Sequence, residues 1–246
     1  MDFKGKIALV TGSSRGIGKA TIIELASKGC NVIINYVNGE KEAEELKKYV
    51  NNKFNIDVMV IKADVSNEEE VKEMIDKIIT KFNKIDILVN NAGIAIDNGF
   101  HEKTIDEFKK VLDVNLIGTY LVSKYVSVQM LKQKYGKIIN VSSTNGINTN
   151  YPYSIDYDAS KAGVISLTRN LALQLAPYIN VNCVAPGWVN TEMNEELDEN
   201  YIKEENKKIL LNRFADPEEI AKVIAFLASD DASYVNNAVI RVDGGY

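Results

Sequence analysis

Histidine and cysteine are scarce in this chain of 246 residues. The only histidine is His101, and the two cysteines, Cys30 and Cys183, stand apart inside apolar runs. A catalytic zinc site needs several His, Cys, Asp or Glu ligands at regular spacing, and the sequence contains no such pattern. We therefore expect no metal, which argues against a zinc-dependent alcohol dehydrogenase. Buried free thiols are typical of a reducing compartment.

An excess of basic charge and long apolar runs are missing as well. The 29 Lys and Arg residues are outnumbered by 34 Asp and Glu, and the formal net charge is −5. Nucleic acids and anionic membranes are bound through basic patches, so neither is expected as a partner. No window approaches the roughly 20 apolar residues of a membrane span, and residues 1–6 lack the layout of a signal peptide. We expect a cytoplasmic protein.

Short apolar runs alternate with helical patterns along the chain. Runs rich in Val and Ile are typical of strands buried on both faces. The alternation predicts a single α/β domain over 1–246, a Rossmann-type, doubly wound parallel sheet of seven strands with helices on both faces. We expect strands near 6–11, 31–36, 57–63, 85–90, 137–142, 180–185 and 238–242. Helices are expected near 16–28, 39–52, 67–82, 104–134, 157–176 and 216–229.

Residues 187–215 interrupt this rhythm after the sixth strand. A long connection at the carboxyl end of a strand lies where ligands bind in open α/β sheets, so we interpret it as a substrate lid. A solvated helical hairpin without a role is the alternative. The lid carries seven carboxylates, those of Glu192, Glu195, Glu196, Asp198, Glu199, Glu204 and Glu205.

A glycine-rich turn closes the first strand and opens the first helix, with the spacing G-x-x-x-G-x-G. Glycines let the backbone approach a pyrophosphate, and the free N–H groups at a helix start attract its charge. An ordinary strand-to-helix turn explains many such patterns, but the position in the first βα unit favours a nucleotide site. The candidate residues are Gly12, Ser14, Arg15, Gly16, Ile17 and Gly18.

Two further motifs follow the third and fourth strands, at carboxyl ends where a dinucleotide would lie. An Asp there can accept a hydrogen bond from an adenine amino group, and small residues let the backbone lie close to a ring and ribose. Taken singly, each is better interpreted as a loop-start cap. The candidates are Asp64, Val65, Asn91, Ala92 and Gly93.

Tyr157 and Lys161 stand four residues apart and share a helix face. A nearby ammonium favours the charged form of a phenol and lowers its pKa from about 10, so the pair suits acid/base chemistry. Spacing alone does not establish this role in a chain with 12 tyrosines. The context separates Tyr157, because its helix is rich in small residues and follows a strand ending in Ser142-Ser143. The same spacing recurs at Tyr49/Lys53, on a helix amid charges, and at Tyr120/Lys124, in the middle of an apolar helix.

These motifs occur together in one order. They are the glycine turn at 12–18, Asn-Asn-Ala-Gly at 90–93, Ser142-Ser143, Tyr157 with Lys161, Asn180-Val181-Asn182, Pro186-Gly187 and Asp243-Gly244-Gly245. On this combination the chain resembles the short-chain dehydrogenase/reductase family from Lys6 to Tyr246. Within that family it is most similar to the beta-ketoacyl-acyl-carrier-protein reductases.

The resemblance implies a role for each matching residue. Tyr157 would exchange the proton with the substrate oxygen, Ser143 would hydrogen-bond that oxygen, and Lys161 would lower the pKa of Tyr157 and hold the nicotinamide ribose. Asn115 would hold a proton-relay water near the lysine. The catalytic set is Asn115, Ser143, Tyr157 and Lys161, and the nicotinamide pocket would be shaped by Pro186, Gly187, Val189 and Thr191. The loop 144–156 departs from the family pattern by one extra residue.

The end of the second strand is neutral. Enzymes that select NAD place a carboxylate there for the ribose 2′-hydroxyl, but this strand ends in Asn35-Tyr36 and the next carboxylate is Glu40. A neutral end leaves room for a 2′-phosphate, which Arg15 can bind through charge-assisted hydrogen bonds. We expect NADP(H), with Asn35 and Tyr36 beside it, and keep NAD(H) as the alternative.

The leading hypothesis is an NADP(H)-dependent reductase of a carbonyl such as a 3-oxoacyl thioester, in fatty acid biosynthesis. A dehydrogenase of a free polyol, sugar or sterol alcohol stays open, as does a nucleotide-binding regulator without turnover. The resemblance also implies a homotetramer, packed through the helices at 104–134 and 157–176, and an acyl-carrier protein as partner. Carrier docking is disfavoured by the acidic lid and by Leu173, where related reductases have a base, although Lys134 keeps another.

Overall fold

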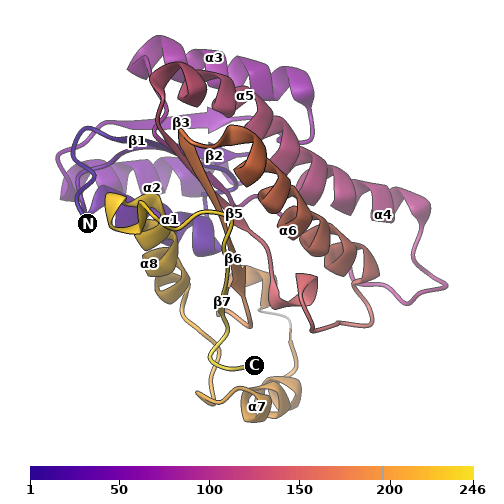
Figure 1. The fold of residues 1–246 in the computed structure, drawn as a ribbon. Helices are drawn as coiled ribbons and strands as arrows, with labels where there is room; N and C mark the ends of the chain where they lie inside the picture. Colours follow the sequence, from indigo (N-terminus) through magenta and orange to yellow (C-terminus); the bar gives the residue numbers. More distant parts are fainter. Residues whose placement is uncertain (195–196) are drawn as a thin grey trace.

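The computed structural model describes residues 1–194 and 197–246 (Figure 1). All seven strands pair in parallel in one sheet, in the order β3-β2-β1-β4-β5-β6-β7. This confirms the doubly wound parallel sheet expected from the alternating pattern. The strands are β1 (Ile7–Val10), β2 (Asn31–Tyr36), β3 (Val58–Lys62), β4 (Ile87–Asn90), β5 (Gly136–Val141), β6 (Ile179–Pro186) and β7 (Val239–Val242).

Helices cover both faces of the sheet, because successive residues of a strand point to opposite sides. In β1, Ala8 and Val10 pack in the core beneath α1, α2 and α8, whereas Ile7 and Leu9 pack beneath α3, α5 and α6. The helices are α1 (Gly16–Ala26), α2 (Glu40–Lys53), α3 (Glu68–Phe82), α4 (Ile105–Leu112), α5 (Gly118–Gln133), α6 (Ile155–Leu175), α7 (Glu199–Lys208) and α8 (Pro217–Ala228).

The helical stretch expected near 104–134 is present, but a π-helical turn lies inside it. Helix α4 ends at Leu112, five residues from Asp113 to Ile117 form a π-helical turn, and α5 then continues to Gln133. A π-helical turn inside a helix frequently marks a functional site, and Asn115 lies in the middle of this one. Periodicity cannot reveal the extra residue, because the apolar pattern continues on either side.

The strand order changes direction between β1 and β4, which lie side by side with Val10 opposite Val89. Loops from the carboxyl ends of the two strands diverge there, and ligands of open α/β sheets bind in that crevice. The glycine turn follows β1 and Asn91 follows β4, so the fold brings two predicted motifs to one place. In Figure 1, α7 and the C-terminus lie at the end of the sheet toward which β6 runs.

Among the described residues, no helix combines the length and apolar character needed to cross a membrane. Over the same residues, no group of three His, Cys, Asp or Glu side chains is arranged as a metal site.

Candidate functional site

The glycine turn packs tightly against the loop that follows β4. A Cβ at Gly12, whose φ is +59°, would lie 2.8 Å from the Cα of Ala92. A Cβ at Gly18 would lie 2.6 Å from Nδ2 of Asn91 and 2.6 Å from the carbonyl oxygen of Gly12. Both positions therefore require glycine.

Asn91 and Thr11 hold these two loops together. The Asn91 side-chain amide donates to the carbonyl oxygens of Thr11 and Gly12, each at 2.9 Å. In return, the hydroxyl of Thr11 accepts from the backbone N–H groups of Asn91 at 3.0 Å and Ala92 at 3.1 Å. The sequence reasoning missed the part played by Thr11.

The beginning of α1 suits an anion. Among the described residues, Arg15 at the N-cap position makes no side-chain hydrogen bond to the helix, so the first-turn N–H groups remain available to a ligand. Helix starts of this kind bind phosphate through N–H groups and the helix dipole. Together with the closely packed glycines, this arrangement fits the pyrophosphate of a dinucleotide.

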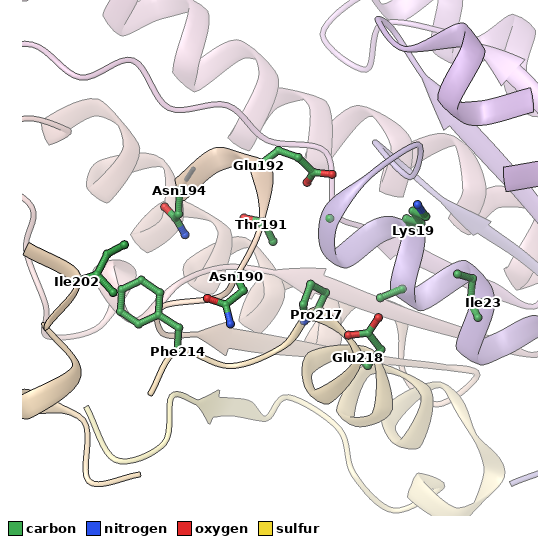
Figure 2. A pocket seen from close by; sticks show the side chains of 12 residues that line it. Lys19, Ile23, Asn190, Thr191, Glu192, Asn194, Ile202, Phe214, Pro217 and Glu218 are labelled. Atoms are coloured by element: carbon green, nitrogen blue, oxygen red, sulfur yellow. The ribbon is translucent and has the colours of Figure 1, made fainter. Parts of the chain in front are cut away.

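A cavity of about 440 Å³ lies between α1, the segment after β6 and the beginning of α8. Figure 2 shows Glu192 extending from that segment toward the beginning of α1. A Cβ at Gly16 would lie 3.5 Å from Cγ2 of Thr191 and 3.6 Å from Oε2 of Glu192. Thr191, predicted at the nicotinamide pocket, is thus brought next to the glycine turn.

Asn35, predicted beside the cofactor, supports the glycine turn from inside the fold. The residue is 1% exposed. Its Oδ1 accepts from the N–H of Gly12 at 3.1 Å, and its Nδ2 donates to the carbonyl oxygen of Ala63 at 2.9 Å. Tyr36 lies in the core beneath α1 and α2. The side chains of these two residues therefore stabilise the end of β2.

Asp64 and Val65 also serve the fold. Oδ1 of Asp64 accepts from the N–H of Ser66 at 2.9 Å and from its hydroxyl at 2.7 Å, in the turn before α3. Val65 is 3% exposed, and a Cβ at Gly118 would lie 2.6 Å from its Cγ2. Both side chains thus serve the loop before α3, as the loop-start interpretation predicts. Only the backbone of Val65 remains available to contact a ligand.

Asn115 clamps the loop after β4 onto α6. Its Oδ1 accepts from the N–H of Ile94 at 2.8 Å, while its Nδ2 donates to the carbonyl oxygen of Ile94 at 2.9 Å and to the hydroxyl of Ser160 at 3.0 Å. A Cβ at Gly93 would lie 3.4 Å from both Oδ1 of Asn115 and Nζ of Lys161. Two predicted catalytic residues and one predicted cofactor residue are therefore neighbours.

Tyr157 and Ser143 meet beside this cluster. The hydroxyl of Ser143 lies near the phenol of Tyr157. Burial raises the pKa of Tyr157 to about 12, the nearby Ser143 hydroxyl opposes this rise, and the carboxylate of Asp158 adds to it. The phenol is thus protonated at neutral pH, as a proton donor must be.

Lys161 lies over the ring of Tyr157 and is hydrogen-bonded to the end of β5. Its Nζ lies 5.4 Å from the centroid of the Tyr157 ring and donates to the carbonyl oxygen of Val141 at 2.9 Å. Burial lowers the pKa of Lys161 itself to about 8. The cause is the depth of the side chain, which is 4% exposed.

Helix α7 packs across the carboxyl end of β6. Trp188, two residues after Pro186, stacks on Phe214 with centroids 5.3 Å apart, and Tyr201 of α7 contacts both Trp188 at 5.9 Å and Tyr151 at 6.4 Å. These aromatic contacts connect the predicted lid to the loop before α6. Sequence reasoning singled out none of these rings.

Glu205 holds the lid from the inside. Its carboxylate is 3% exposed and accepts from Nε1 of Trp188 at 3.1 Å and the hydroxyl of Tyr246 at 2.5 Å. Lys208 pairs with it at 2.6 Å. The sequence reasoning counted Glu205 as one of seven surface carboxylates, whereas it is buried; Glu195 and Glu196 lie outside the described residues.

Known proteins resemble this chain over nearly its whole length. A family model described as Enoyl-(Acyl carrier protein) reductase matches residues 12–246. The chain is 41% identical to 3-oxoacyl-(acyl-carrier-protein) reductase FabG of Aquifex aeolicus, over 98% of this chain and 97% of that protein. It is 42% identical to the protein of the same name from Thermotoga maritima, over 100% and 99%. The crystal structure of levodione reductase superposes with a TM-score of 0.94 at 35% identity, covering 99% of this chain and 98% of that one.

Proposed function

The chain belongs to the short-chain dehydrogenase/reductase family and is an oxidoreductase, and we propose that it reduces a 3-oxoacyl thioester to the 3-hydroxy compound with NADPH. The observation that carries the chemistry is the proximity of the Ser143 hydroxyl to the phenol of Tyr157. Two donors at one point can bind a single carbonyl oxygen, and the neutral phenol can give it a proton. Reduced nicotinamide supplies the hydride when bound.

Lys161 and Asn115 support this pair. The ammonium of Lys161 lies beside Gly93 and Asn115, where it would hydrogen-bond the nicotinamide ribose and favour negative charge on the phenol after proton transfer. Asn115 holds the loop after β4 in place through both polar groups of Ile94. Pro186, Gly187, Val189 and Thr191 would complete the nicotinamide pocket.

NADPH is proposed over NADH on the surroundings of Arg15. Arg15 is exposed, and the N-terminus of α2 lies next to the glycine turn, since a Cβ at Gly39 would be 3.2 Å from Oγ of Ser14. A 2′-phosphate placed there would meet a guanidinium and the start of a second helix. The neutral end of β2 offers no carboxylate to a 2′-hydroxyl.

The substrate proposal draws on the relatives named as 3-oxoacyl-(acyl-carrier-protein) reductases. In this proposal residues 1–246 form a single domain. Residues 187–215 act as its substrate lid, because Tyr201 of α7 connects the segment after β6 to the loop before α6. The levodione reductase structure favours a second candidate, in which a free carbonyl or alcohol is the substrate.

We also propose that the protein forms a homotetramer. Several large apolar side chains on α5 and the turn before it are exposed, and a helix face of this kind suits packing against a second copy. They are Ile117 at 43%, Tyr120 at 45%, Val128 at 52% and Leu131 at 41% exposed.

The deciding experiment follows the absorbance of NADPH and of NADH with a panel of carbonyls. The panel contains a short 3-oxoacyl thioester, the same acyl group on carrier protein, and free cyclic diketones. Turnover of the thioester with kcat/KM at least tenfold above that of the free carbonyls supports the proposed substrate. Turnover of the free carbonyls alone supports the second candidate.

A further inference from the structure

A buried ion pair lies directly beside Tyr157. Nζ of Lys103 is 2.9 Å from Oδ2 of Asp156, and the two side chains are 4% and 0% exposed. Of the ion pairs formed within residues 1–194 and 197–246, it is the only one with both partners buried. A buried charge is costly unless it is paired and hydrogen-bonded, so this position demands an explanation.

The pair joins two segments on either side of the site. Asp156 is in the first turn of α6, and its Oδ1 accepts from the N–H of Tyr157 at 2.9 Å. Lys103 ends the 97–103 segment, downstream of Gly93, and its Nζ also donates to the carbonyl oxygen of Ile96. One carboxylate thus contacts both the backbone of Tyr157 and the loop opposite.

Two further contacts run between the same segments. The N–H of Asn98 donates to the carbonyl oxygen of Tyr153 at 2.8 Å. The hydroxyl of Ser154, which holds the N-cap position of α6, is directed to Asp97. The 97–103 segment is therefore fastened to residues 151–156 along its length, and the ion pair is the contact closest to Tyr157.

We infer that Lys103 and Asp156 are positioning residues for Tyr157. The pair fixes the first turn of α6 against the 97–103 segment, which sets where the phenol stands, and its two opposite charges add no net charge there. This inference rests on the proposed acid/base role of Tyr157. Neither residue touches the reacting atoms, so both act through the tyrosine.

The charges around the phenol fix the sign of the effect. Asp158 already raises the pKa of Tyr157, so a carboxylate at position 156 without its lysine should raise it further. An ammonium at position 103 without its aspartate should lower it. The ionisable and hydrogen-bonding groups that face this region are Asp156, Asp158 and Lys161 on α6, Lys103 and Asp97 on the 97–103 segment, Cys183 on β6 and Ser143 before α6.

The test measures the pH dependence of kcat for carbonyl reduction in Lys103→Met, Asp156→Asn and the double variant. A charge within a few ångströms shifts a pKa by about one unit or more. The pH at which kcat falls on the alkaline side of the profile, its alkaline limb, should rise by about one unit in Lys103→Met. It should fall in Asp156→Asn. These directions hold whether Tyr157 or Lys161 sets the limb, because an added charge acts on both in the same sense. The double variant should return the limb to within about 0.3 units of the wild type.

Lys84→Met is the matched control. Lys84 pairs with Asp86 at 2.9 Å, and the buried carboxylate of Asp86 likewise accepts a backbone N–H, that of Ile7 at 2.8 Å. This pair precedes β4, at the amino end of the strands and opposite the glycine turn, so its loss should lower the midpoint of thermal unfolding and leave the pH profile in place. Lys103→Met should lower that midpoint too, with kcat reduced at least tenfold and the dissociation constant of NADPH within twofold of wild type.

Equal pH profiles in wild type, both single variants and the double variant would overturn the inference. If Lys103→Met does not fold, Asp156→Asn and the double variant decide the outcome by the same measurement. Tyr157→Phe is assayed in parallel. Full activity in Tyr157→Phe would instead refute the proposed function, whereas an inactive Tyr157→Phe with unmoved profiles in the ion-pair variants refutes the positioning role alone.

Discussion

Nζ of Lys161 lies 5.4 Å from the centroid of the Tyr157 ring and donates to the carbonyl oxygen of Val141 at 2.9 Å. The pair with the same spacing at Tyr49 and Lys53 does form a hydrogen bond, at 2.7 Å, on the surface of α2. Direct contact between phenol and ammonium thus occurs where no chemistry is expected. The pair of Tyr157 and Lys161 is distinguished by the burial of Lys161, which is 4% exposed, and by Ser143 near the phenol.

Tyr157→Phe is expected to abolish turnover. The substitution removes the proton donor and keeps the ring, and general acid catalysis typically contributes ~10²–10⁴-fold. NADPH should still bind, as measured by quenching of intrinsic fluorescence. Tyr49→Phe is the control, because it removes the hydroxyl from the pair that is hydrogen-bonded and exposed. A Tyr157→Phe enzyme within threefold of wild-type kcat would remove Tyr157 from the mechanism.

Lys161→Met is expected to stabilise the protein while it abolishes turnover. Burial lowers the pKa of Lys161 from 10.5 to about 8, which corresponds to about 3 kcal/mol against the charged form. Lys161→Met also leaves the carbonyl oxygen of Val141 without its hydrogen bond, which costs about 1 kcal/mol and offsets part of this gain. The free energy of unfolding at pH 7 should therefore rise by about 1–2 kcal/mol, measured by urea denaturation.

The pH dependence of that gain has a definite sign. Between pH 8 and 10.5 the unfolded chain keeps the proton of Lys161 and the folded protein has lost it, so wild-type stability increases with pH. The advantage of Lys161→Met should shrink across this window. Lys77→Met, which removes an exposed ammonium on α3, should show no such trend. A constant difference from pH 7 to 10 would mean that Lys161 is not held in an unfavourable charged state.

The sequence predicted the sheet well because strands buried on both faces leave a strong local signal. The runs at 31–36 and 180–185 became β2 and β6 with their bounds nearly intact. The side chain of Asn67 caps α3 by accepting from the N–H groups of Glu69 and Glu70, and the N–H of Asp216, which precedes α8, donates to the side chain of Glu219. The alternation predicted the parallel, doubly wound sheet, whereas the strand order appears only in the structure.

The contacts that sequence reasoning missed are long-range. Lys103 and Asp156 are distant in the chain, and neither lies in a motif, so their pairing appears only in the folded protein. Asn35 looked like a ligand for the cofactor because it ends a strand, yet its amide is directed inward to Gly12 and Ala63. Motifs identify which backbone lies at the crevice, but the direction of each side chain depends on neighbours from other elements.

Arg15→Ala is expected to weaken NADPH much more than NADH. The guanidinium is the cation of the glycine turn, and the carboxylate of Glu42 lies close by, with Oε2 at 3.1 Å from the position of a Cβ on Gly39. Arg15 must therefore outweigh that carboxylate to hold a 2′-phosphate. We expect kcat/KM with NADPH to fall at least tenfold and kcat/KM with NADH to change less than threefold. Glu42→Gln should act in the opposite direction and tighten NADPH alone. Equal wild-type kcat/KM for the two cofactors would contradict the proposed preference.

The surface around the lid argues against strong selection for an acyl-carrier protein. Arg213 is held by both carboxylate oxygens of Glu219 at 2.7 Å, and Lys207 pairs with Glu204 at 2.6 Å, so neither base is free for an acidic partner. Leu173 is 74% exposed on α6, at a position where a base would serve carrier docking. Lid carboxylates such as Glu192 would repel an acidic carrier at low salt.

We therefore expect a 3-oxoacyl group to be reduced with similar kcat/KM on carrier protein and on a short thioester. Leu173→Arg should raise kcat/KM for the carrier-borne form several-fold, lose that gain as ionic strength increases, and leave the short thioester unchanged. Leu173→Gln controls for the loss of the apolar side chain. A hundredfold preference of the wild type for the carrier, eroded by salt, would show that a docking surface exists and that the charge of the lid does not prevent its use.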